Sequence, residues 1–278
     1  MTSNINTSPH KEISMNINLL IFWMLLGVFG VGTIEYLIAG VLPQIASDVA
    51  VSEATAGLLV TVYALTVVVG GPALTIFTSR VKRIPPLIVG LMTLFITGNV
   101  LTSVAHNFII LIIARIMTAL PHATFFALCL VVATTLVEPE FQGRVISRIT
   151  LGLNLATVLG VPLGTLVGNQ YGWRTSFVIV AVLQTVVTVA LVLTIRRVPE
   201  RSGGGIAAEV KVFRRGEVLK ALGLTMLSHA YLCCLHSSHP ILDSTRGSDQ
   251  VPLQFSFSSL VLDRSLGTYL AAIMPIKT

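Results

Sequence analysis

The sequence is poor in charge and in cysteine. Only 11% of its 278 residues are Asp, Glu, Lys or Arg, whereas an ordinary soluble domain has about 25%. So little charge cannot cover a surface in water, and 54% of the residues are hydrophobic, with a mean hydropathy of +0.86. The three cysteines, Cys129, Cys233 and Cys234, indicate no disulfide framework and no metal site. We therefore expect an integral membrane protein that needs the lipid bilayer and no cofactor.

The hydrophobic residues form long blocks separated by short polar breaks. Several blocks reach the ~20 residues that a helix needs to cross ~30 Å of hydrocarbon. This pattern predicts an all-α, polytopic fold, with a six-helix bundle over 19–197. The first block is too long for a signal-peptide core, so we expect it to be retained. The six predicted spans are Leu19–Leu42, Ala56–Phe77, Pro86–Val104, Phe108–Val132, Ile149–Val167 and Ser176–Ile195.

Basic residues fall mainly in alternate loops, which indicates an orientation because Lys and Arg mark cytoplasmic loops. The N-terminal segment 1–18 and the linker 198–217 are then cytoplasmic, and the protein is a multi-pass protein of the cell membrane. The basic residues do not gather on one face, so no nucleic-acid partner is expected. The loops after the second, fourth and sixth spans hold Arg80, Lys82 and Arg83, then Arg144 and Arg148, then Arg196, Arg197, Arg201, Lys211, Arg214, Arg215 and Lys220.

Glu35 is an acid inside the first span, in a segment that also holds Gly30, Gly32 and Tyr36. A charge at membrane depth costs ~3 kcal/mol or more unless a partner or a water-filled cavity receives it. Desolvation favours the neutral carboxyl, which suits a group that binds and releases a proton in each cycle. Glu35 is therefore a candidate proton carrier. The alternative is a carboxylate hydrated near the outer interface.

Two further polar residues lie inside the fourth span. Arg115 is a candidate charge modulator, and the alternative is that its long side chain reaches water at the outer interface. His122 is a candidate for hydrogen bonding to a substrate or a neighbouring helix, and the alternative is a bond to a backbone carbonyl beside a kink at Pro121. His122, Tyr36 and Asn154 are our candidates for the substrate cavity.

The fifth span contains glycines at every fourth position, Gly160, Gly164 and Gly168, with Pro162 between them. Such a smooth stripe lets another helix approach closely and predicts either a passive packing seam or a pivot. The sequence has no Gly-x-Ser-x-Gly elbow, no His-Glu-x-x-His and no phosphate-binding loop with lysine. We therefore do not expect an enzyme.

Four motifs occur in order between Phe29 and Pro199. Together they resemble the drug–proton antiporter branch of the major facilitator superfamily, in particular its arabinose and sugar-efflux members. The resemblance implies two six-helix halves that rock about a midplane site and export small molecules as protons enter. The motifs are a glycine–acid–aromatic segment followed by Leu-Pro-x-Ile-Ala over Gly32–Asp48, an Ala-Arg pair at Arg115, Gly160-Val-Pro162-Leu-Gly164, and Gly172-Trp173-Arg174-x-x-Phe177.

A fifth motif of that family is incomplete here. The family's loop between its second and third helices reads Gly-x-x-x-Asp-Arg-x-Gly-Arg, and this chain keeps its cations as Arg80 and Arg83. Thr75, Ser79 and Lys82 replace the first glycine, the aspartate and the second glycine. The loop thus lacks the carboxylate that would hold it to neighbouring helix ends.

The segment 218–278 begins like a seventh helix and changes character near Tyr231, after which no hydrophobic block of spanning length follows. Codons read two bases out of phase would permit sequences that resemble helices seven and eight of the family. This indicates a frame-shifted tail, and the alternative is a divergent C-terminus.

The function we expect is proton-coupled efflux of a drug or sugar. The alternative is a non-transporting membrane remnant, and a membrane enzyme is the third and least favoured hypothesis. The sequence does not indicate an oligomeric state or a particular substrate.

Overall fold

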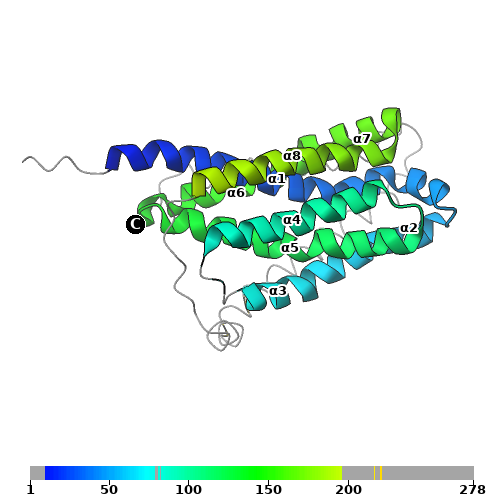
Figure 1. Ribbon diagram of the computed structural model, residues 1–278, viewed down its shortest axis with the longest axis horizontal. Coiled ribbons are helices and arrows are strands. Elements are labelled where there is room, and N and C mark those ends of the chain that lie inside the picture. The colour runs from blue at the N-terminus through cyan, green and yellow to red at the C-terminus, as the bar shows by residue number, and fades with distance from the viewer. Residues whose placement is uncertain (1–9, 79–80, 82, 196–215, 217–219, 221–278) are drawn as a thin grey trace, which may run out of the picture.

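The structure is a computed structural model that describes residues 10–195, apart from 79, 80 and 82, together with residues 216 and 220 (Figure 1). The expected linker 198–217, apart from residue 216, and the segment 218–278, apart from residue 220, lie outside the described residues. The described elements are α1 (His10–Asp48), α2 (Glu53–Leu65), the π-turn η1 (Thr66–Gly70), α3 (Gly71–Thr78), α4 (Ile84–Ser103), α5 (Phe108–Thr135), the 3-10 turn η2 (Pro139–Phe141), α6 (Gln142–Leu155), the π-turn η3 (Ala156–Gly160), α7 (Val161–Tyr171) and α8 (Trp173–Ile195).

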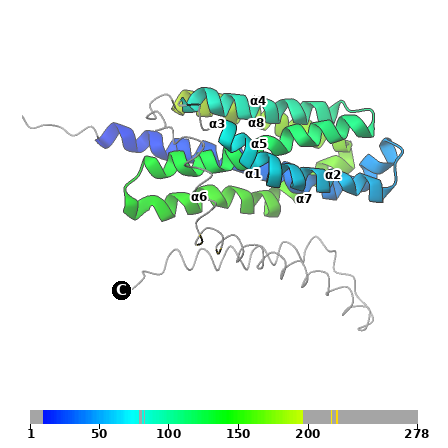
Figure 2. The same ribbon diagram turned by 90° about the horizontal axis from the view of Figure 1, so that it is seen from below.

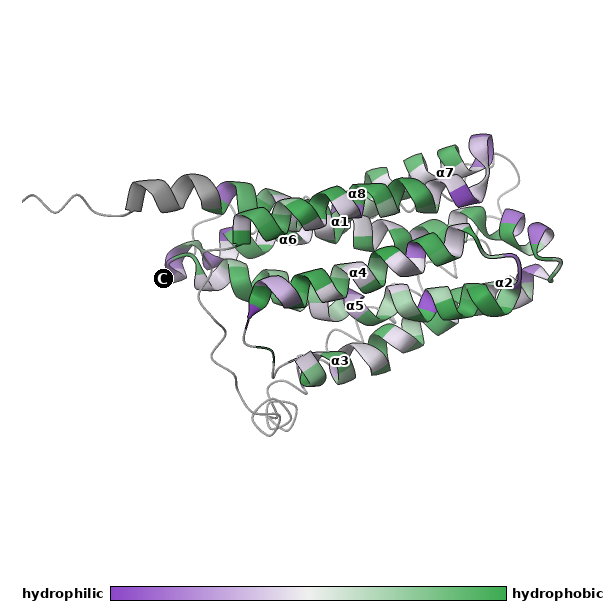
Figure 3. Ribbon diagram, viewed as in Figure 1, coloured by the Kyte–Doolittle hydropathy of each residue, from purple (hydrophilic) through white to green (hydrophobic). Residues whose placement is uncertain are grey.

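The described part of the chain forms six rods that are long and hydrophobic enough to cross a membrane. In chain order the first rod is α1, and the third, fourth and sixth are the single helices α4, α5 and α8. The second rod is α2, η1 and α3 in continuous succession, and the fifth is η2, α6, η3 and α7. Hydrophobic residues run along the rods and polar residues gather toward their ends (Figure 3). The all-α, six-helix fold expected from the sequence is therefore confirmed.

Two rods extend beyond the predicted spans by more than three residues. Helix α1 begins at His10 rather than Leu19 and ends at Asp48 rather than Leu42. The fifth rod begins at Pro139, ten residues before the predicted Ile149. The prediction for this rod was too short because its first turns are amphipathic: Val145 and Ile149 are buried while neighbouring polar residues face outward.

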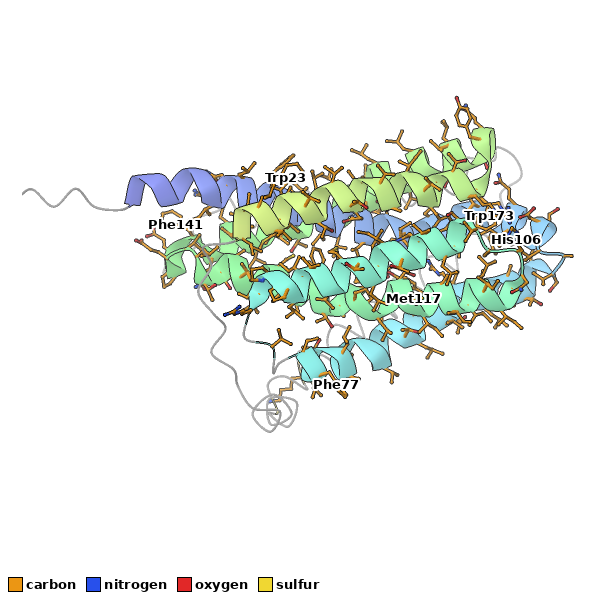
Figure 4. The ribbon with its side chains drawn as sticks, viewed as in Figure 1. Trp23, Phe77, His106, Met117, Phe141 and Trp173 are labelled. Carbon is orange, nitrogen blue, oxygen red and sulfur yellow. The ribbon has the colours of Figure 1, made fainter. Side chains whose placement is uncertain are left out.

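The connections lie at alternate ends of the bundle. Figure 4 shows Trp173 and His106 at one end and Phe141 at the other, and Figure 2 shows the rods running along a common axis. Two rods start with polar caps, because the Ser52 and Asn107 side chains accept hydrogen bonds from the backbone N–H groups of Thr55 and Ile110. We call the end with Phe141 the basic end, because Arg83 directly precedes α4 there and Arg144 and Arg148 lie in the first turns of α6.

At the opposite end, Arg174 joins three connections. Its guanidinium contacts the Asp48 carboxylate at the end of α1 and donates a 2.7 Å hydrogen bond to the carbonyl of Ala105. It also stacks 4.3 Å from the centre of the Trp173 ring. The turn before it needs a glycine, since Gly172 has φ +89°, a conformation that side chains disfavour. Arg174 therefore ties α1 and the α4–α5 connection to the start of α8.

Both π-turns sit in the same local sequence pattern. Each ends at a glycine, Gly70 or Gly160, and each is followed two residues later by a proline, Pro72 or Pro162. Proline has no N–H, so one carbonyl in the preceding turn loses its intrahelical partner, and insertion of an extra residue relieves the crowding. Near Pro162, where the sequence predicts a bend, the structure has a π-turn that ends two residues before the proline.

Candidate functional site

Arg115 is the centre of a polar cluster inside the bundle. Its side chain is 1% exposed, so it does not reach an interface as the alternative prediction proposed. Its guanidinium donates hydrogen bonds to three backbone carbonyls, those of Ile34 (3.1 Å), Glu35 (3.5 Å) and Leu59 (3.4 Å). The same group stacks on the Tyr63 ring, 4.1 Å from its centre. Backbone oxygens and an aromatic face therefore solvate this buried cation.

His122 connects the same cluster to the Glu35 carboxyl group. Its Nδ1 lies 2.9 Å from the Tyr63 hydroxyl, and its Nε2 lies 3.8 Å from Glu35 Oε2. Of the two sequence-based alternatives, the bond to a neighbouring helix is therefore present, because Tyr63 belongs to α2. Helix α5 continues through Pro121 without a break.

Three rods supply the cluster. Arg115 and His122 are seven residues apart on α5, which places them on one face two turns apart. Tyr63 comes from α2, two residues before the end of that helix, and Glu35 comes from the middle of the span Ile17–Asp48 on α1. Within the described residues the Glu35 carboxylate faces His122 and forms no ion pair with Arg115.

Glu35 lies at the edge of the cluster, where the side chains of α1 become partly exposed. Its side chain is 29% exposed, and the next residue, Tyr36, is 42% exposed. Asn154 is half-buried in the last turn of α6, and its side chain forms no hydrogen bond within the part of the chain that the structure describes. Tyr36 thus adjoins the cluster in sequence, whereas Asn154 belongs to another element and has no contact that links it to Glu35.

The glycine stripe of α7 packs against α1. A Cβ atom added at Gly160 would lie 2.1 Å from Thr33 Oγ1, one at Gly164 would lie 2.7 Å from Leu37, and one at Gly168 would lie 2.7 Å from Val41. The α1 partners are also four residues apart, so the two stripes run in register and in parallel. We call these two facing stripes the glycine seam. Close approach at this face explains why the sequence has glycine there.

Of the motif in the connection between α3 and α4, the structure describes Arg83 but not Arg80. Arg83 occupies the position before the first turn of α4, with extended backbone. Arg80 lies outside the described residues, so its expected role is not tested. The two cations therefore stay a prediction.

Tyr63 is the member of the cluster that the sequence did not single out. On α2 it is one hydrophobic position among many, and its only sequence signal is a hydroxyl group at membrane depth. It is buried and contacts both Arg115 and His122. A buried tyrosine needs a partner for its hydroxyl, and a search for such a partner would have pointed to His122.

The cluster can hold and exchange a proton. It combines a partly accessible carboxyl, an imidazole and a phenol with a fixed positive charge, and the described residues hold no group of three His, Cys, Asp or Glu that could bind a metal. An open hollow between Pro43–Asp48 and Tyr171–Arg174 lies elsewhere, about 12–20 Å along α1 from Glu35 at 1.5 Å per residue.

Comparison with known proteins identifies relatives across most of the chain. The family model of the major facilitator superfamily matches residues 24–274. The inner membrane transport protein YdhP of Escherichia coli K12 is 36% identical over 261 residues, which are 92% of this chain and 66% of YdhP. The uncharacterized MFS-type transporter YfhI of Bacillus subtilis 168 is 30% identical over 94% of this chain and 66% of its own length. The putative transporter AraJ of Escherichia coli K12 is 26% identical over 91% of this chain and 64% of its own length.

Solved structures share the fold. A bacterial homologue of the human lysosomal transporter Spinster, crystallised in an inward-facing and unoccupied conformation, has a TM-score of 0.55 and 21% identity, over 70% of this chain and 45% of that one. A crystallised peptide transporter has the same TM-score and 15% identity, over 86% of this chain and 50% of that one. The chain thus spans about half the length of these structures and 66% of YdhP. The relatives' names describe transport proteins and no enzyme.

Proposed function

This chain belongs to the major facilitator superfamily, and from that premise we propose that it exports a small molecule across the cell membrane in exchange for protons, with Glu35 as the proton carrier. The observation that carries the proposal is the position of Glu35. Its carboxyl is partly accessible at membrane depth, where a permanent charge is costly unless water or a partner receives it. A group that takes up a proton when it faces one side and releases it when it faces the other meets this constraint.

Arg115 is the proposed electrostatic modulator of that proton. Its guanidinium is fixed by hydrogen bonds to the carbonyls of Ile34 and Glu35, so its charge stays close to the carboxyl throughout. A nearby positive charge favours the ionised carboxylate and thereby makes proton release possible in a poorly hydrated site. Tyr36, His122 and Asn154 remain the proposed cavity residues, of which Tyr36 and His122 adjoin Glu35.

The glycine seam is the proposed moving surface of the transport cycle. Its glycine face is free of side chains that would interlock with α1, so α7 can shift along α1 without crossing large barriers. The π-turn Ala156–Gly160 supplies a local break in the regular helix. In this proposal the seam, not the loop with Arg80 and Arg83, allows alternating access.

The proposed orientation places the N-terminus and the basic end in the cytoplasm, since basic residues are retained on that side. The proposed branch within the superfamily is that of the drug–proton antiporters, and the proposed substrates are of the drug or sugar type.

Flux in proteoliposomes tests the proposal. Vesicles that contain this chain alone are loaded with ethidium as a drug-type probe or arabinose as a sugar-type probe, with and without a proton gradient. We expect gradient-driven flux in the wild type and none in Glu35→Gln, which keeps the shape and loses the titration. Glu53→Gln is the control, because Glu53 is exposed in the first turn of α2. Gradient-driven flux that persists in Glu35→Gln would remove the carrier assignment.

The second candidate is a membrane remnant that inserts but does not transport. The chain spans 66% of YdhP, and the segment after residue 230 carries the proposed frame shift. The nucleotide sequence decides the shift: an alternative frame near codon 230 that encodes further hydrophobic spans supports it, and early stop codons contradict it. Absence of flux for both probes in the wild type would favour the remnant.

A further inference from the structure

The His122 ring has a polar partner on each of its two nitrogens. Nδ1 lies 2.9 Å from the hydroxyl of Tyr63, and Nε2 lies 3.8 Å from Oε2 of Glu35. A neutral imidazole carries a hydrogen on one nitrogen and a lone pair on the other. Whether Nε2 presents a hydrogen or a lone pair to Glu35 therefore depends on whether Nδ1 accepts the hydrogen bond from Tyr63 or donates it.

The burial of Tyr63 decides that direction. Its side chain is 2% exposed, and a buried hydroxyl hydrogen must find an acceptor. Nδ1 of His122 is the acceptor within reach. The other polar neighbour, Arg115, contacts the face of the Tyr63 ring and has donors only. The phenol therefore donates to Nδ1, and Nδ1 holds the lone pair. The hydrogen of the neutral ring is left on Nε2.

We propose that Tyr63 is a positioning residue that fixes His122 as the Nε2–H tautomer, so that His122 presents a hydrogen-bond donor to the Glu35 carboxyl. At 3.8 Å the two atoms are about 0.8 Å beyond an ordinary hydrogen bond. A small side-chain movement closes the gap when Glu35 is ionised. A protonated Glu35 no longer needs that donor, so proton binding releases this one side-chain contact between α1 and α5, while the Arg115 bonds to the α1 backbone remain.

Few other titratable groups face His122. Within the described residues α3, α4 and η1 carry none, although α3 and α4 pack along α5. The groups that do adjoin it are Glu35 of α1, Tyr63 of α2 and Arg115 of its own helix, and Cys129 lies two turns further along α5. Helix α6 also packs against α5 and carries Arg144 and Arg148 in its first turns at the basic end, and Tyr36 follows Glu35 on α1. The groups in direct contact with the ring are Tyr63 and Glu35. The consequence for proton coupling rests on the proposed function, whereas the tautomer itself does not.

Nitrogen-15 NMR of the ring in the full chain, reconstituted in lipid, tests the tautomer without any transport assay. The signal is assigned by its loss in His122→Asn. We expect the Nε2–H tautomer in the wild type and a mixture of tautomers in Tyr63→Phe, which keeps the ring over Arg115 and removes the hydroxyl. Tyr171→Phe is the matched control, because Tyr171 is exposed at the end of α7, and it should keep the wild-type signal. An Nδ1–H tautomer in the wild type, or an unchanged signal in Tyr63→Phe, would overturn the proposal.

Two replacements of His122 separate positioning from mere packing. A glutamine amide can place its N–H near the position of Nε2, whereas an asparagine amide reaches only the position of Nδ1. We expect His122→Gln to retain gradient-driven flux and His122→Asn to lose about tenfold or more, since the donor opposite Glu35 is missing. Equal flux in the two variants, whether high or low, would contradict the role of the Nε2 donor. If the wild type shows no flux, the NMR result still decides the tautomer.

Discussion

Arg115 keeps its charge inside the bundle because backbone carbonyls replace the water that it gives up. The five N–H groups of a guanidinium form a rigid fork that can reach several oxygens at once, and here the oxygens belong to α1 and α2. A lysine would place a single point charge at this position and could not serve both helices. Charge alone is therefore not what the site requires.

Replacement of Arg115 by lysine should therefore destabilise the bundle even though the charge is kept. We expect a loss of about 2 kcal/mol in the free energy of unfolding, because hydrogen bonds to a charged group contribute about 1.5–3 kcal/mol. The measurement is unfolding in mixed micelles, followed by circular dichroism. Arg144→Lys is the control, because Arg144 lies at the basic end, where its guanidinium is 5.7 Å from the Phe141 ring. Equal stability of wild type and Arg115→Lys would show that the three carbonyl bonds contribute little.

The sequence identified the charged residues of the site but not their environment. Glu35 and Arg115 stand out because charge is rare at membrane depth. Whether Arg115 is buried or reaches the interface depends on which carbonyls of other helices come near it, and no local pattern encodes that. Tyr63 was missed for the same reason, since its importance arises from two contacts across helices. Asn154 was chosen by polarity alone, and the structure gives it no bond to the cluster.

At the scale of the elements, glycine determines which helices can touch. Gly152 on α6 shows this most directly, because a Cβ atom there would lie 2.5 Å from the backbone oxygen of Leu25 on α1. A side chain can turn aside, whereas a backbone oxygen cannot move without its helix. Together with the glycine seam, Gly152 brings the whole fifth rod close to α1.

Replacement of Gly152 by alanine should therefore displace α6 from α1. We expect a clear loss of stability, of about 1–3 kcal/mol, as is typical of overpacking. Gly90→Ala is the control on α4, because a Cβ atom there has no neighbour within 4 Å. Thermal unfolding of both variants in the same detergent provides the comparison. A loss of similar size in Gly90→Ala would mean that helix flexibility, rather than contact with α1, explains the effect.

The helix boundaries were predictable where the pattern was hydrophobic and were not where it was amphipathic. The spans at Pro86 and Phe108 were placed to within about two residues of the observed starts, since polar residues or prolines flank them. The fifth span was placed too late because Arg144 and Arg148 interrupt the hydrophobic pattern at its beginning. The π-turns were not predicted from the sequence, although each ends two residues before a proline.

At the scale of the whole molecule, the fold has two chemically distinct ends. One end collects the cations Arg83, Arg144 and Arg148, and the other holds Asp48 and Arg174 in contact. A bilayer with a negative cytoplasmic surface favours one of the two orientations. The proposed orientation can therefore be tested by asking which end reacts with a reagent that stays outside the cell.

Single cysteines report this orientation in intact cells. In a variant without Cys129, Cys233 and Cys234, we expect Asn107→Cys to react with a membrane-impermeant maleimide and Glu138→Cys to react only after the cells are opened. The reason is that the α4–α5 connection lies at the end opposite the basic one. The two variants serve as controls for each other, because each must react under one of the two conditions. The reverse pattern would place the N-terminus outside.

The π-turn η3 also sets the angular phase of the fifth rod. A stripe at every fourth residue turns by about 40° per step around a regular α-helix, because 3.6 residues complete one turn. The wider turn at Ala156–Gly160 takes more residues and reverses part of that rotation. Gly152 below it and Gly160, Gly164 and Gly168 above it consequently all meet α1. One inserted residue thus works as an angular correction of about 100°, which keeps two helices in contact over the length of a membrane.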